Sequence, residues 1–176
     1  AYTNLKKSGV SNPVTAVLLN FRSYDTLLEL AVLFAVVVIM FPANKTYKIE
    51  SAANVTFSQI ATINLVRKIL PLTIVMSGYL LWTGASQPGG AFQAGALLAG
   101  GGLMALFSKA ISIRFEHTLW RFALTGALAA FIFAGAATHW LTGGFLLYPS
   151  KQAGLFIISI EFAATFSISI TLVLFY

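Results

Sequence analysis

The stretch GLFIISIEFAATFSISITLVLF, residues 154–175, decides the class of this protein. It runs for 22 residues with one charged side chain, Glu161, and a helix of about 20 apolar residues spans the hydrocarbon core of a bilayer. Of all 176 residues, 58% are hydrophobic and only 9% are charged, against about 25% charged in soluble domains. These figures exclude a disordered chain, a fibrous protein and an ordinary soluble domain. We therefore expect an integral membrane protein.

Apolar runs of helical length recur along the chain, without the strict alternation of a membrane β-barrel. We predict an all-α membrane protein with about five transmembrane helices, over Tyr24–Pro42, Lys68–Trp82, Phe92–Ile113, Leu119–Trp140 and Gly154–Phe175. A shorter apolar piece, Pro13–Phe21, suits an N-terminal helix lying at the membrane interface.

Small side chains let helices approach closely in a bilayer, where lipid tails compete with apolar contacts. Two runs carry such residues at a spacing of four: Ala91, Gly95 and Ala99, and Gly126, Ala130, Ala134 and Thr138. We expect both stripes to pack against neighbouring helices. The run of glycines at 100–102 either belongs to this packing or marks a bend at a functional site.

The net charge of +6 comes from scattered Lys and Arg with no basic stripe, so we expect no nucleic-acid partner. Basic residues are more numerous on one side of the predicted spans, and the positive-inside rule makes that side cytoplasmic. The N-terminus is then outside and the C-terminus inside. With no cysteine and two distant histidines, we predict no metal site, and the absence of catalytic and phosphate-binding motifs predicts no enzyme activity and no cofactor.

An ionisable side chain within a membrane span is costly, so each one is a candidate for function. Arg22, Asp25 and Glu29 lie at steps of three and four on one helix face, where they form either a structural ion pair or a proton- or cation-binding group. In its apolar run, Glu161 is either protonated or needs a partner, for which the candidates are His139, Lys151 and a group of another subunit.

Two further basic groups are weaker candidates for an ion pathway. Lys109 lies near the end of its span, where it either snorkels to the cytoplasmic interface or contributes to the pathway. His139 lies beside Trp140 at an interface and is interpreted as a surface histidine or a proton relay.

The stretch QPGGAFQAG at residues 87–95 resembles the PGGGFxGG signature of the MnhB/MrpB family, small subunits of multisubunit Na+/H+ antiporters. The residues that match the signature, and that we expect to have a structural role, are Pro88, Gly89, Gly90, Phe92 and Gly95. Alanines replace two further glycines of the signature. The resemblance covers roughly residues 65–176. It implies a final helix with an acidic residue near its start, a place that Glu161 fills.

A second stretch, NFRSYDTLLE at residues 20–29, resembles the DFRGFDTLGE segment near the C-terminus of the large MrpA antiporter subunit. This resemblance, over residues 12–43, implies an MrpA-like segment, residues 1–43, with one transmembrane helix. A polar linker, residues 44–64, then joins it to the four-helix MnhB/MrpB-like domain, residues 65–176.

Together the resemblances imply an accessory subunit of an Mrp-type Na+/H+ antiporter in a prokaryotic plasma membrane. Its partners would be other membrane subunits, the lipid bilayer, protons and Na+. Asp25, Glu29 and Glu161 would help to form the ion pathway, with Arg22 pairing with Asp25. The alternatives are a subunit of a redox-driven ion pump such as a membrane-bound hydrogenase or a complex I-like enzyme, a purely structural scaffold, and a lone small-molecule carrier.

Overall fold

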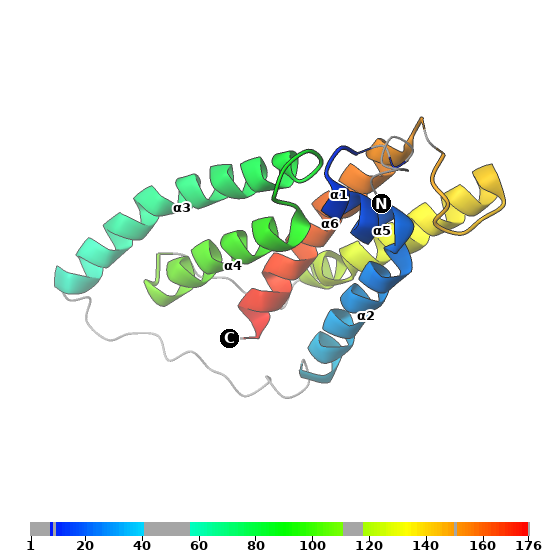
Figure 1. The fold of residues 1–176 in the computed structure, drawn as a ribbon. Coiled ribbons are helices and arrows are strands. Elements are labelled where there is room, and N and C mark those ends of the chain that lie inside the picture. The colour runs from blue at the N-terminus through cyan, green and yellow to red at the C-terminus, as the bar shows by residue number, and fades with distance from the viewer. Residues whose placement is uncertain (1–7, 9, 41–56, 111–117, 150, 176) are drawn as a thin grey trace.

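The computed structural model describes residues 8, 10–40, 57–110, 118–149 and 151–175, and every regular element in these ranges is a helix (Figure 1). The order is α1 (Pro13–Ala16), a π-helical turn (Val17–Phe21), α2 (Ser23–Met40), α3 (Phe57–Thr83), α4 (Ala91–Phe107), α5 (Thr118–Thr142) and α6 (Ala153–Leu174). All five predicted long helices are therefore present, and the N-terminal piece is helical as expected.

Helix α6 is the centre of the molecule. It packs against α4 on one side and α5 on the other, and α2 also contacts both α5 and α6 (Figure 1). Its inner residues include Ile157, Ile160, Ala164 and Ile168, all at most 4% exposed. The apolar run at residues 154–175, from which a membrane protein was predicted, thus forms the most buried helix of the described chain.

Glycines allow α4 to fit between α3 and α6. A β-carbon at Gly95 would lie 3.0 Å from the Thr165 carbonyl oxygen of α6, and one at Gly101 would lie 2.5 Å from Thr73 Oγ1 of α3. The predicted packing stripe on α4 is confirmed, and its glycine run at 100–102 stays helical. On α5, Ala134 and Thr138 are buried, but nothing in the described residues lies within 4 Å of the β-carbon position of Gly126, so packing at that end of the stripe stays a prediction.

Two predicted helix boundaries are wrong. Helix α3 begins at Phe57 rather than Lys68, so residues 57–64 of the predicted linker are helical. Helix α4 ends at Phe107 rather than Ile113, because Lys109 adopts a left-handed backbone with φ 57° and its N–H bonds to the Leu106 carbonyl. The N–H of Ala110 bonds to the Ala105 carbonyl, which completes a Schellman motif that stops the helix.

Within the residues that the structure describes, three helices are long and apolar enough to cross a membrane: Ile60–Thr83, Leu124–Thr142 and Ala153–Leu174. The apolar helix Ala91–Phe107 is shorter. The chain is thus an α-helical membrane protein, and the count of five crossings stays a prediction. The remainder of the linker, residues 44–56, lies outside the described residues.

Candidate functional site

The loop between α3 and α4 folds back onto the last turn of α3, and three glycines make this possible. The N–H groups of Gly84 and Gly90 both donate to the carbonyl of Leu80, at 3.2 and 2.9 Å. A β-carbon at Gly84 would lie 2.6 Å from the Gly90 Cα, and one at Gly89 would lie 2.5 Å from the Leu80 carbonyl oxygen. Larger residues at these positions would force the loop open, because no real β-carbon makes contacts this short.

Gly90 brings this loop against the carboxyl group of Glu161. A β-carbon on Gly90 would lie 3.1 Å from Glu161 Oε1 and 3.8 Å from Gln93 Oε1. Gly90 also has φ 113° and ψ −175°, a backbone conformation that is essentially restricted to glycine. The loop motif and the acidic residue of α6, which are 71 positions apart in the sequence, therefore form one site.

Glu161 is buried but incompletely satisfied. It is 3% exposed, and its Oε2 atom has no hydrogen-bond partner in the described part of the chain. Its own backbone carbonyl accepts the hydroxyl of Thr165 at 2.8 Å. The predicted partners His139 and Lys151 are both exposed and make no ion pair with it. A carboxylate buried without a counter-charge is costly, so this group calls for a proton, a cation or a partner from outside the described residues.

The N-terminal segment holds the same loop from the other side. The buried Asn12 amide donates to the carbonyls of Gly84 and Gln87 at 2.9 and 2.7 Å, and Thr15 Oγ1 donates to the Gly84 carbonyl at 2.6 Å. The backbone N–H groups of Ser11 and Asn12 both donate to the Ala85 carbonyl. We call these contacts the loop clamp. They join the N-terminal segment to the loop that backs Glu161.

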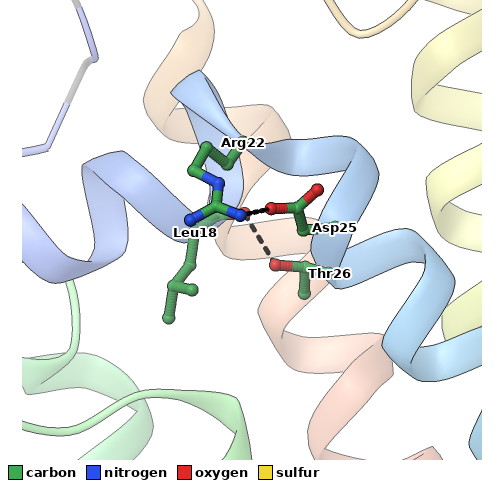
Figure 2. Close-up of polar contacts among 4 residues, drawn as sticks. All are labelled: Leu18, Arg22, Asp25 and Thr26. Carbon is green, nitrogen blue, oxygen red and sulfur yellow. Dashed lines mark hydrogen bonds and ion pairs between the residues drawn. The ribbon is translucent and has the colours of Figure 1, made fainter.

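The second sequence motif forms the corner between the π-helical turn and α2 (Figure 2). The N–H of Arg22 bonds to the Val17 carbonyl, five residues back, so the Leu18 carbonyl accepts the hydroxyl of Thr26 instead, at 2.7 Å. The Arg22 guanidinium forms an ion pair with Asp25 in the first turn of α2, as predicted. Both side chains are substantially exposed, so the pair fastens a corner at the surface of the chain.

The remaining predicted site residues lie apart from this corner. Glu29 is exposed on α2 and makes no hydrogen bond or ion pair with the described residues. Lys109 is exposed in the Schellman turn after α4, and His139 is exposed in the last turn of α5. Neither contacts Glu161 through a hydrogen bond or ion pair. The structure thus brings together Arg22 with Asp25, and Glu161 with the glycine motif.

A groove of about 430 Å³ opens beside this site between α2, α4 and α6. Leu33 of α2 and Phe92 and Gln93 of α4 line it, together with Ile168, Thr171 and Leu172 of α6. Gln93 also approaches Gly90 and therefore connects the groove to the surroundings of Glu161.

Residues 61–176 match the family model described as a domain related to the MnhB subunit of Na+/H+ antiporter. The chain belongs to this family. A comparison with curated protein sequences finds no match.

The MnhB-related domain and the segment before it also share a fold with part of a solved structure, "Structure of Mrp complex from Dietzia sp. DQ12-45-1b". The TM-score is 0.71 at 22% identity, over 97% of this chain and 21% of the matched one. The chain therefore spans about a fifth of the length of the protein it matches.

Sequence reasoning missed Asn12, Thr15 and Gln93 in this MnhB-related chain. Asn12 precedes Pro13, and its side-chain oxygen accepts the Val14 N–H at 3.0 Å, so Asn-Pro was a readable helix-start signal. Nothing local signalled its amide bonds to residues more than 70 positions away. Gln93 lies within the glycine motif at residues 87–95, but its position in that motif did not indicate a role at the site.

Proposed function

We propose that this MnhB-related chain is a membrane subunit of an Mrp-type cation/proton antiporter, in which Glu161 binds a proton or a cation on the translocation pathway. The family match to a subunit of a Na+/H+ antiporter supports the class of transporter. The observation that carries the proposal is the burial of Glu161 with one carboxylate oxygen unpaired, against the glycine motif. A buried ionisable group kept in such a setting favours a role in ion transfer over one in stability.

Gln93 links the Glu161 site to the groove between α2, α4 and α6. Gln93 lies between the Gly90–Glu161 contact and the groove, and Thr171 is a second polar residue on the groove wall. We propose that these groups serve the approach of an ion or of water to Glu161. The fold likeness over nearly the whole chain within one chain of an Mrp complex supports treating residues 12–43 as an MrpA-like segment that works with the MnhB-related domain.

Transport by the Glu161→Gln variant tests this function. The variant should be made in the full parent protein, together with its partner subunits, in cells that lack their own antiporters. Everted membrane vesicles then report cation-induced collapse of a proton gradient through the fluorescence of acridine orange. We expect assembly to survive and exchange to fall to a small fraction of the wild-type rate, because glutamine keeps the size of glutamate but cannot take up a proton or a charge.

Ser159→Ala is the matched control, since Ser159 is exposed on the same helix and its hydroxyl donates to the Leu155 carbonyl of that helix. Its exchange should equal that of the wild type. Wild-type exchange in Glu161→Gln would overturn the proposed role of this residue. Loss of the assembled complex in that variant would favour the structural-scaffold alternative. A parent complex that purifies with redox subunits would place the chain in a redox-driven pump.

A further inference from the structure

The groove between α2, α4 and α6 is open because α2 and α4 do not pack against one another. Both helices contact α6, and they diverge on either side of it (Figure 1). Leu33 forms the α2 wall, Phe92 and Gln93 form the α4 wall, and residues of α6 form the floor. Its lining is mainly apolar, as expected of a surface that is covered in the membrane rather than wetted.

Glu29 is not among the residues that line this groove, but it lies on α2 one helical turn before Leu33, which lines it. It lies four residues before Leu33, and residues at this spacing share a helix face, so Glu29 continues the α2 wall by one turn toward the start of the helix. Val36, three residues after Leu33, extends the same face in the other direction and is 37% exposed. The wall of α2 is thus one carboxylate followed by apolar side chains.

No group of the described chain neutralises Glu29. Its side chain is exposed and makes no hydrogen bond or ion pair with the described residues, and the nearest basic residue along the helix, Arg22, is already paired with Asp25. Glu29 stands six residues into α2, which places it about 9 Å below the start of the helix. Because the sequence predicts that this apolar helix crosses the membrane, an unpaired carboxylate on its exposed face would be costly.

We propose that this groove receives a transmembrane helix of another subunit, and that this helix presents a lysine or arginine to Glu29. The inference rests on the proposed function, because it assumes that the chain works inside a multisubunit membrane complex. An apolar helix face fills the groove, and one basic side chain removes the cost of the carboxylate. A lipid tail would fill the same space but would leave Glu29 without a counter-charge.

Photo-crosslinking in the intact complex tests this docking. Benzoylphenylalanine replaces Val36 on the groove face or, as a control, Val38, which is 52% exposed but lies about 140° around the helix from Leu33. After irradiation of native membranes, we expect the probe at position 36 to join one transmembrane peptide of another subunit, which the probe at position 38 does not reach. Val36 and Glu29 are seven residues apart, so that peptide should carry a lysine or arginine about two turns from the crosslinked residue.

Charge reversal supplies the second measurement. Glu29→Lys should reduce co-purification of the crosslinked subunit several-fold in mild detergent, and reversing the partner's basic residue to glutamate should restore it. Lipid adducts alone at position 36, a peptide without a basic residue at that distance, or a failed rescue would each overturn the docking proposal. None of these readouts measures transport, so their failure is distinct from a failure of the role proposed for Glu161.

Discussion

Replacing Gly90 with alanine should damage both the stability of the protein and the Glu161 site. With φ 113° and ψ −175°, residue 90 occupies a region that costs a residue with a β-carbon about 1–3 kcal/mol. The new methyl group would also lie 3.1 Å from Glu161 Oε1, so the carboxyl group would have to move by a few tenths of an ångström. We expect the free energy of unfolding to fall by about 1–3 kcal/mol, and ion exchange to fall further than this loss of stability explains.

Two other glycines provide matched controls. Gly100 and Gly126 lie inside helices, and in the described part of the chain nothing lies within 4 Å of the β-carbon position of either. Alanine at these positions should leave exchange unchanged and keep or raise stability, by at most about 1 kcal/mol from helix propensity. Stability is measured by denaturant titration of the purified protein, and exchange by the vesicle assay. If Gly90→Ala matched the wild type in both, or if Gly100→Ala were equally harmful, the link between the glycine motif and Glu161 would be wrong.

The other predictions concern the loop clamp, the α3–α4 contact and a buried tyrosine. Asn12→Ala should destabilise the protein by about 1–3 kcal/mol in denaturant titration, because it removes the amide that donates to the buried Gly84 carbonyl and to the Gln87 carbonyl, and Asn12→Asp should not restore the loss since aspartate cannot donate. Gly101→Ala should lower the thermal midpoint, and adding Thr73→Ala should recover it by removing the hydroxyl 2.5 Å from the new methyl group; no recovery would argue against this contact. Burial raises the pKa of the Tyr148 hydroxyl, which has no partner in the described residues, so the folded protein loses stability relative to the unfolded chain as pH rises above about 10. Tyr148→Phe should remove that loss without destabilising the protein at pH 7, and a steeper alkaline loss in the variant would contradict this.

The helices were predictable because apolar runs of this length have few alternatives, and all five long helices occur where the sequence places them. Their ends were less predictable. Phe57 begins α3 in a stretch that holds Ser58, Gln59 and Asn64, so this part of the helix lacks the unbroken apolar run from which the spans were predicted. Helix α4 ends because Lys109 adopts a left-handed conformation that is most common for glycine. A lysine at this position does not predict a helix end.

The site was predictable as a set of residues but not as an arrangement. The cost of a buried charge singled out Glu161, and the glycine motif was visible as a tight turn. Their contact could not be inferred, because it depends on how α4 and α6 approach each other at Gly95. The loop clamp could not be predicted either. The Asn12 amide donates to backbone carbonyls, and since every residue has one, the sequence does not indicate which carbonyls accept.

From the sequence alone, the cost of an ionisable side chain in a membrane span applies equally to Glu29 and Glu161. The structure shows that their environments differ. The chain itself buries Glu161, with α4 packed beside it and the clamped loop above it. It leaves Glu29 exposed one helical turn from Leu33 of the groove, while the nearby Arg22 is paired with Asp25. A buried group with an unpaired oxygen suits reversible loading, because each change of its charge is felt strongly in a low-dielectric site. An exposed carboxylate on an apolar face suits recognition instead, since it penalises any neighbour that lacks a matching charge. We therefore propose different roles for the two acidic residues: ion exchange for Glu161, and selection of a neighbouring helix for Glu29.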